Sequence, residues 1–192
     1  MAVDRRIVKT KEALKAAMVS LLEEKELSKI TVKELCERAD INRGTFYTHY
    51  ADQVDLYRSI ENELYCGLET YIRSLTPDEV DSPENSVAYI VRIFKYCRFH
   101  ADYISVFTLP HRKSLVCQKI VEFGKKYNLY GMIESTRNKP AFFEDYFYEY
   151  ISLGVIGIIN LWMEKGMVES DEQMAQVVFF FVRNTINDSF LR

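Results

Sequence analysis

The sequence predicts an all-α protein, in which a three-helix N-terminal domain is joined by a long connecting helix to a helical C-terminal domain. Apolar residues recur at helical spacing along most of the 192 residues, whereas no segment shows the alternation of a half-buried strand. The chain holds only seven Gly and four Pro, too few for a turn-rich all-β fold. We expect the domains to span residues 1–52 and 53–192, with the connecting helix at 53–75.

The first helix is expected over residues 10–24, and the second follows Thr31. The Thr31 hydroxyl can accept from the free backbone amides of the first turn, and Glu34 completes a capping box. In both helices the apolar residues recur at the spacing that places them on one face. These residues are Leu14, Ala17, Met18, Leu21 and Leu22 in the first helix, and Val32, Leu35, Cys36 and Ala39 in the second.

A tight turn joins the second helix to a third. Asp40 ends the second helix, Ile41 closes the turn toward the core, and Asn42 caps a helix over residues 43–50 with Phe46 buried. Two helices joined by a three-residue turn form the helix-turn-helix motif, whose second helix enters the major groove of DNA.

The C-terminal domain is expected to be helical throughout. Thr76-Pro77 stops the connecting helix, and a Gly166 C-cap and a Ser170 N-cap separate the last two helices. The expected elements are helices at 53–75, 87–99, 103–108, 113–127, 142–165 and 171–190, an acidic linker at 76–86 and a break at 135–140.

The helix-turn-helix segment carries side chains that hydrogen-bond to DNA. Arg43 can fork onto guanine O6 and N7, Thr45 offers a hydroxyl and a methyl group, and Gly44 lets the backbone approach closely. Lys33 is a second candidate for a base edge, and Thr31 is a candidate for a phosphate. Each residue alone is most simply part of a solvated helix face, but their spacing after a capped turn favours DNA binding for the set.

This segment resembles the N-terminal DNA-binding domain of the TetR family of transcriptional regulators. The family motif ends in a Tyr-x-His-aromatic element, a short turn and a fourth helix, and this chain has Tyr47-Thr48-His49-Tyr50 before Ala51-Asp52. The resemblance implies that Tyr47 and His49 donate to phosphates, while Thr48 stays open between base and phosphate.

Two positions depart from the family pattern. Asp40 stands where glycine is usual, although Asp tolerates the left-handed backbone that glycine supplies. Gln53 begins the fourth helix, where a phosphate-binding lysine is common. Gln53 can donate a hydrogen bond but releases no counterion, so we expect weaker and less salt-dependent DNA affinity.

The resemblance also implies a small-molecule site in the C-terminal domain, which is rich in aromatic residues. An apolar or aromatic ligand would act by favouring one spacing of the two DNA-binding domains of a dimer. The alternative is that these aromatic residues form only the core and a subunit interface. The candidate lining residues are Phe94, Phe99, Phe107, Phe147 and Tyr150.

In the TetR family the last two helices pair with those of a second subunit, so the resemblance implies a homodimer. Gly154 and Gly157 would permit close helix crossing at that interface, or would merely give packing space within one subunit. Two-fold symmetry then predicts a palindromic operator. The other candidate interface residues are Ile158, Leu161, Met174, Val177, Val178 and Phe181.

The sequence therefore predicts a ligand-responsive transcriptional repressor that binds a double-stranded operator as a homodimer. The alternative is a TetR-like adaptor that acts through protein contacts without an operator of its own. The segment from Gly154 to Gly166 resembles the TetR subgroup named for dihydroxyacetone kinase control. No enzyme is expected, because the chain has no activated Ser or Cys arrangement, no catalytic carboxylate pair and no phosphate loop.

Charge and cysteine usage agree with this function. Residues 1–50 carry ten Lys/Arg against eight Asp/Glu, a net charge of +2. The other 142 residues carry fifteen against twenty, a net charge of −5. The overall charge of −3 therefore belongs to a chain with a mildly basic N-terminal part and an acidic remainder. The four cysteines lack zinc spacing, and neither a metal nor a cofactor is expected. The longest apolar stretch, residues 151–163, is shorter than the ~20 residues that cross a bilayer, and no signal peptide is recognised, so we expect a cytoplasmic protein.

Overall fold

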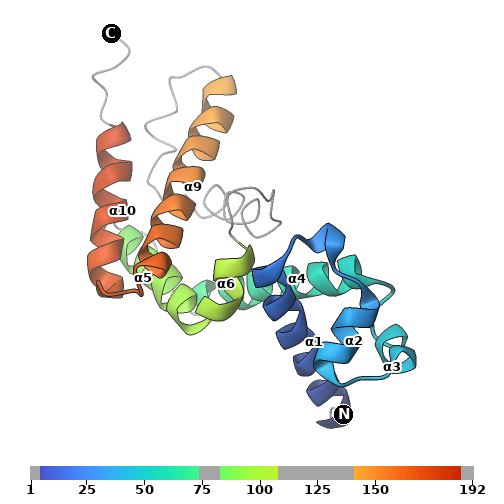
Figure 1. Ribbon diagram of the computed structural model, residues 1–192. Helices are drawn as coiled ribbons and strands as arrows, with labels where there is room; N and C mark the ends of the chain where they lie inside the picture. The colour runs from blue at the N-terminus through green and yellow to red at the C-terminus, as the bar shows by residue number, and fades with distance from the viewer. Residues whose placement is uncertain (1–4, 74–82, 108–140, 187–192) are drawn as a thin grey trace. The chain divides into compact units, whose positions relative to one another are not determined.

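The structure, a computed structural model, describes residues 5–73, 83–107 and 141–186 (Figure 1). Within these ranges the chain is helical apart from its turns, and it contains no strand, so the predicted all-α class is confirmed. The contacts divide the chain into two compact units, residues 1–63 and 64–192. The long helix α4 (Gln53–Arg73) runs unbroken through that division, and the functional boundary expected after residue 52 stays a prediction.

The N-terminal unit contains α1 (Arg5–Glu24), the 3₁₀ turn η1 (Leu27–Lys29), α2 (Val32–Ala39), α3 (Arg43–Tyr47) and the first part of α4. Helix α1 packs against α2, and α2 packs against α3. The predicted core is confirmed, since Leu14, Met18, Leu35 and Phe46 are all 0% exposed. Removing each such side chain from water contributes about 1.5–3 kcal/mol to folding.

Two helix boundaries in this unit differ from the sequence expectation. Helix α1 starts at Arg5 and not at residue 10, so it is longer than its buried face requires. Helix α3 ends at Tyr47 and not at residue 50. There the backbone tightens into bonds between residues three apart, from the Thr48 amide to the Thr45 carbonyl (3.3 Å) and from the His49 amide to the Phe46 carbonyl (2.9 Å).

A buried lysine joins α1 to α4 within the N-terminal unit. Lys15 is 7% exposed, and its Nζ donates to Glu12 (2.9 Å) and to Glu63 (2.7 Å). Burial acts to lower the pKa of Lys15, but the hydrogen bonds and charges of Glu63 and Glu12 together raise it above its ordinary value. The Lys15–Glu63 ion pair therefore links α4 to α1 in the unit that carries the helix-turn-helix.

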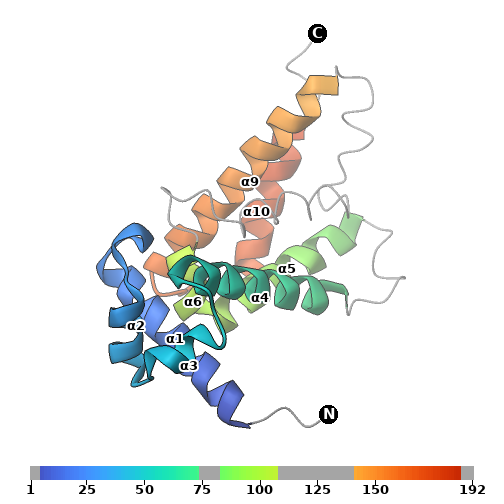
Figure 2. The same ribbon diagram turned by 90° about the vertical axis from the view of Figure 1, so that its right-hand side faces the viewer.

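The C-terminal unit contains the end of α4, α5 (Pro83–Phe99), α6 (Ala101–Phe107), α9 (Ala141–Glu164) and α10 (Asp171–Ile186). Helix α10 lies along α5, and α9 contacts α5, α6 and α10. Helices α9 and α10 run side by side in opposite directions (Figures 1 and 2). The linker expected to extend to residue 86 is too long, because α5 already begins at Pro83, a residue favoured in the first turn of a helix.

Some expectations fall on residues that the structure leaves undescribed. These are the helix at 113–127, the break at 135–140 and the last residues of the final helix. The predicted caps between the two closing helices are confirmed. Gly166 has a φ of +78°, and the Ser170 hydroxyl accepts from the Gln173 amide (3.2 Å) while the Gln173 side chain accepts from the Ser170 amide (2.8 Å).

A glycine sets the distance between α4 and α5 in the C-terminal unit. The Tyr96 hydroxyl donates to the carbonyl of Leu64 (2.8 Å) in the buried space beside Gly67. A Cβ atom on Gly67 would lie 2.5 Å from the Tyr96 oxygen, closer than real Cβ contacts allow. Any larger residue at this position would therefore force the two helices apart or break the hydrogen bond.

Candidate nucleic-acid interface

The first helix of the helix-turn-helix is held by the capping box that the sequence predicts. The Thr31 hydroxyl accepts from the Glu34 amide (3.3 Å), and the Glu34 carboxylate accepts from the Thr31 amide (3.0 Å). Lys25 also donates to Glu34. This hydrogen bond from Lys25, followed by those from Thr31, lowers the pKa of Glu34 to about 2, so the carboxylate of the box stays charged in mildly acidic solution as well as at neutral pH.

The turn before the recognition helix uses the left-handed backbone that was expected at Asp40. Asp40 has a φ of +53° and a ψ of +49°, the conformation for which the family pattern places a glycine. The Ile41 amide then donates back to the Cys36 carbonyl (2.9 Å), and the Asn42 side chain accepts from the Gly44 amide (2.8 Å). These bonds fix the start of α3 relative to α2.

Helix α3 is anchored by the buried Phe46 ring, and its other aromatic residue, Tyr47, faces outward. Phe46 is fully buried, with the rings of Tyr47 and Tyr50 at 5.5 and 5.9 Å between centroids. Tyr47 is nevertheless 59% exposed, and His49 is half-buried beside Tyr50. The predicted contact residues Arg43, Gly44, Thr45, Tyr47 and Thr48 are all exposed on this short segment.

Besides Thr31 in the capping box, two more predicted contact residues have partners within the unit. The Thr48 hydroxyl donates to the Thr45 carbonyl (2.6 Å). The Thr48 oxygen can therefore still accept a hydrogen bond, but its proton is already used. Lys33 lies 3.7 Å from Glu37, and both side chains are highly exposed. No described residue forms an ion pair with Arg43. Arg43 is therefore the cation on α3 that is available to a base or phosphate.

Besides the Lys15–Glu63 pair, two features of this unit were not anticipated from the sequence. The Asp52 carboxylate accepts from the Asp55 amide (2.8 Å) and the Asp55 carboxylate accepts from the Ala51 amide (2.9 Å), so the two aspartates cap the first turn of α4, which begins at Gln53. Arg38 forks onto Glu24 (2.6 and 3.2 Å) and ties α2 to α1. The Asp-x-x-Asp spacing is a visible capping signal, whereas the Arg38–Glu24 pair depends on the packing of two helices.

The five aromatic residues proposed to line a ligand cavity lie in different environments. Phe94 and Phe107 are completely buried, and Phe94 packs edge-on against Trp162 (5.1 Å between centroids). Phe147 is 9% exposed, whereas Phe99 and Tyr150 are 84% and 64% exposed. Their role in ligand binding stays a prediction.

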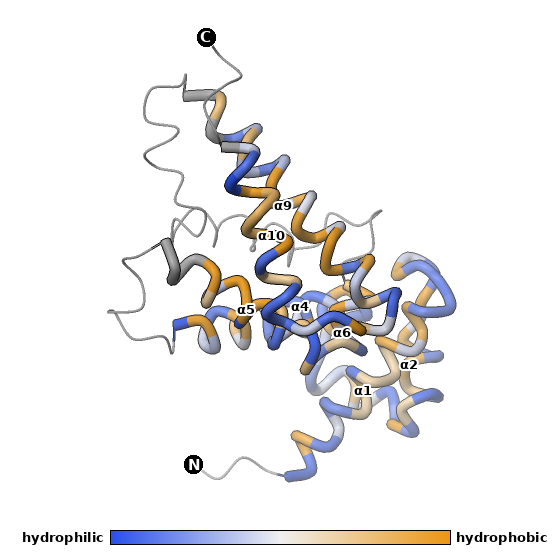
Figure 3. The backbone as a smooth tube through the Cα atoms, turned by 90° about the vertical axis from the view of Figure 1, so that its left-hand side faces the viewer, coloured by the Kyte–Doolittle hydropathy of each residue, from blue (hydrophilic) through white to orange (hydrophobic). Residues whose placement is uncertain are grey.

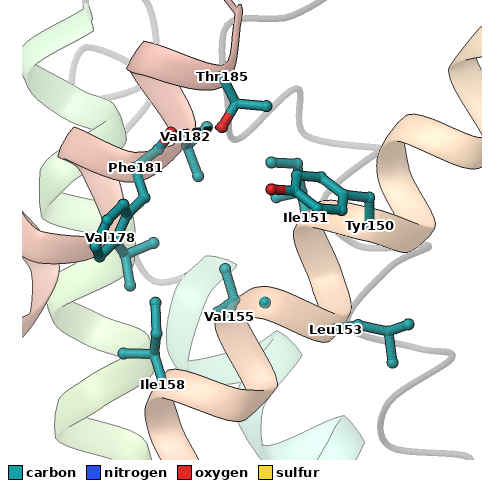
Figure 4. Close-up of a pocket in the computed structure, with 10 residues that line it drawn as sticks. Tyr150, Ile151, Leu153, Val155, Ile158, Val178, Phe181, Val182 and Thr185 are labelled. Carbon is teal, nitrogen blue, oxygen red and sulfur yellow. Dashed lines mark hydrogen bonds between the residues drawn. The ribbon is translucent and has the colours of Figure 1, made fainter.

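An apolar groove of about 340 Å³ lies between α9 and α10 (Figure 4). Half of the eight predicted interface residues line it, and two others, Leu161 and Val177, are 51% and 40% exposed. Met174 is buried at 8% exposure, and Gly157 is exposed. The lining residues are Tyr150, Ile151, Leu153, Gly154, Val155, Ile158, Val178, Phe181, Val182 and Thr185.

The described residues contain no group of His, Cys, Asp or Glu side chains arranged to hold a metal ion. Among the same residues, none of the helices is long and apolar enough to cross a membrane.

Comparison with known proteins identifies relatives of both parts of the chain. An "Uncharacterized HTH-type transcriptional regulator YxbF" of Bacillus subtilis (strain 168) is 39% identical over 59 residues, which are 30% of this chain and only 16% of that relative. The crystal structure of a TetR transcriptional regulator from Streptococcus agalactiae 2603V is similar with a TM-score of 0.66 and 24% identity, covering 93% of this chain and 96% of its own.

A third similar protein is the transcriptional regulator FadR from Bacillus subtilis, solved in complex with stearoyl-CoA. It matches with a TM-score of 0.57 and 17% identity over 89% of this chain and 96% of its own. At such identity these solved structures support the fold alone, and the subgroup resemblance stays a prediction.

The C-terminal part of the chain carries a family match of its own. The TetR family model described as "Transcriptional regulator C-terminal region" matches residues 84–184, more than half of the chain. The chain therefore belongs to the TetR family of transcriptional regulators.

Proposed function

We propose that this regulator binds a palindromic operator as a homodimer, with one α3 in the major groove of each half-site. The observation that carries the proposal is the exposed face of α3, where Arg43, Thr45 and Tyr47 extend from a helix fixed by the Asn42 cap and by buried Phe46. A helix of this kind fits a groove about 12 Å wide, and a forked arginine reads guanine. One such helix makes few contacts, so specific affinity requires two.

The exposed apolar surface of α9 and α10 supports the dimer. Leu153, Leu161, Phe180 and Phe181 are each more than half exposed, which is costly for a surface that stays in water. Gly154 is also exposed, and a Cβ atom added there, or on Gly157, would meet nothing within 4 Å. Because glycine in a helix costs about 1 kcal/mol relative to alanine and packing within the subunit does not require it here, close approach of a second copy accounts better for both glycines.

An orphaned hydroxyl in the C-terminal unit supports ligand binding. Ser152 on α9 is 1% exposed, and its Oγ has no hydrogen-bond partner among the described residues. A buried polar group without a partner costs about 1–3 kcal/mol. A ligand whose buried part is mostly apolar and offers one hydrogen-bonding group to Ser152 would remove this cost. The FadR structure, which has this fold, was solved in complex with stearoyl-CoA, whose long acyl chain is apolar.

DNA selection tests operator recognition. The wild-type protein, incubated with a random duplex pool, is expected to enrich a palindromic sequence. Arg43→Ala is expected to lower affinity for that sequence by about 5- to 150-fold per half-site, because each forked arginine–guanine contact contributes about 1–3 kcal/mol of discrimination. Enrichment of no sequence by the wild-type protein would contradict the proposal and favour an adaptor that acts through protein contacts.

Ser152→Ala tests the ligand role of this position. Without ligand, the alanine variant should unfold at the same or a higher temperature, because it removes a buried hydroxyl that has no partner. Stearoyl-CoA, free fatty acids and aromatic carboxylic acids form the first panel of compounds. At least one should raise the wild-type unfolding temperature and weaken operator binding, and it should do both less in the variant. A variant that responds to the active compound like wild type would exclude Ser152 from the site.

A further inference from the structure

The first two turns of α1 extend beyond the core of the N-terminal unit. Every residue from Arg5 to Lys9 is exposed, including Ile7 at 41%, although Ile7 shares its helix face with buried Leu14 and Met18. In Figures 1 and 2 this end of α1 projects past α2 and α3. Packing within the unit therefore does not account for this part of the helix.

The exposed end is basic, and its charge is unfavourable for the helix itself. Arg5, Arg6, Lys9 and Lys11 all lie in these turns, and the first turn contains no acidic residue. Cations at a helix N-terminus oppose the helix dipole by about 0.3–1 kcal/mol each. No described residue forms an ion pair or hydrogen bond with Arg5 or Lys9, so their charges are not neutralised within the unit.

The basic end lies on the side of the unit that carries the recognition helix. In Figures 1 and 2 the start of α1 and helix α3 occupy the same end of the N-terminal unit, and Figure 3 shows hydrophilic residues at the start of α1. Arg5 and Lys9 are four residues apart, so they share one face of α1. A duplex bound by α3 would bring polyanionic backbone toward these two side chains.

We infer that Arg5 and Lys9 bind backbone phosphates next to the base pairs that α3 contacts. The inference rests on the proposed DNA binding and adds a second, sequence-independent interaction to each half-site. Interactions of this kind with phosphates position a protein on DNA without reading bases. They would also supply counterion release that Gln53, at the start of α4, does not.

The test compares the full-length double variant Arg5→Gln/Lys9→Gln with wild type and with Lys29→Gln. Lys29 is an exposed lysine in η1, beyond the far end of a helix about 30 Å long, and so serves as the matched control. Binding to the selected operator and to an unrelated duplex is measured by fluorescence anisotropy at 50–200 mM salt. Thermal unfolding is measured in parallel, and the double variant should unfold at an equal or higher temperature.

The double variant should bind both duplexes more weakly by the same factor. Its plot of log affinity against log salt should be less steep by about 0.9 for each phosphate that the protein no longer neutralises, so its deficit should shrink about 3.5-fold per phosphate between 50 and 200 mM. Lys29→Gln should match wild type. An unchanged slope, or weaker binding confined to the operator, would overturn the inference while operator recognition stands. A different result would overturn operator recognition alone. In that case wild type would bind all duplexes with equal affinity, while the double variant would still have a less steep plot of log affinity against log salt.

Discussion

Arg98→Ala is expected to lower the free energy of unfolding by about 3 kcal/mol, the largest loss of stability from any single polar side chain described in the C-terminal unit. The Arg98 guanidinium forms three hydrogen bonds and also stacks on an aromatic ring. Its Nε donates to Asp171 (2.9 Å), and its two amino groups donate to the carbonyls of Met167 (3.0 Å) and Glu169 (2.9 Å). Its Cζ atom lies over the Trp162 ring, 4.7 Å from the ring centre.

The loss is large because one side chain holds the turn between α9 and α10 against α5. That turn contains two residues with positive φ, Gly166 and Met167, and its Glu169 carbonyl also accepts from the Trp162 indole (3.1 Å). Truncating Arg98 leaves the Asp171 carboxylate, whose side chain is only 13% exposed, without this partner. Unpaired acceptors in such a site cost more than the hydrogen bond itself contributed.

Lys95→Ala provides the matched control, because Lys95 forms the neighbouring bridge between the same helices. Lys95 lies 3.1 Å from Glu172, with both side chains about half exposed, so its removal should cost less than about 1 kcal/mol. Arg98→Lys should recover less than half of the loss, because an ammonium cannot fork or stack. Urea unfolding at one fixed protein concentration measures all three, and similar values for Arg98→Ala and Lys95→Ala would refute this account.

Local signals in the sequence were sufficient to predict the helix-turn-helix. The caps at Thr31 and Asn42, the left-handed Asp40 and buried Phe46 all depend on neighbours within a few residues, which a pattern of residue types records directly. The DNA-binding roles of these residues stay predictions, because no bound DNA fixes them. What the sequence could not reveal here are pairs distant along the chain, such as Lys15 with Glu63.

Aromatic content was a weaker guide in the C-terminal unit. Of the aromatic candidates for a ligand site, Phe94 and Phe107 are completely buried, whereas Phe99 is 84% exposed at the end of α5. An aromatic residue on an apolar helix can face the core, a ligand or a second subunit, and composition does not separate these environments. The hydrogen bonds of Arg98 to the turn between α9 and α10 were not predicted either. Their acceptors lie 69–73 residues from Arg98 along the chain, too far for a local sequence pattern to record.

The second large effect is expected from Phe181→Glu, which should convert the proposed dimer into a folded monomer. Phe181 lines the groove between α9 and α10 and is 55% exposed, so the carboxylate can stay in water in a single chain. In a dimer sealed by this surface, two charges would be buried against apolar side chains without partners. The dissociation constant of the dimer should therefore rise at least about a hundredfold.

Gln176→Glu is the matched control, which shows whether the effect depends on where the negative charge is placed or only on adding a negative charge. Gln176 is exposed on the same helix, it is outside the groove lining, and its substitution adds the same single negative charge. Sedimentation velocity should show a monomer for Phe181→Glu and a dimer for Gln176→Glu, with unchanged helical circular dichroism in both. In the proposed function both DNA-binding domains of a dimer bind one operator. Phe181→Glu should therefore also lose operator affinity, although Arg43 is unchanged. A Phe181→Glu protein that remains dimeric would place the subunit interface on another surface.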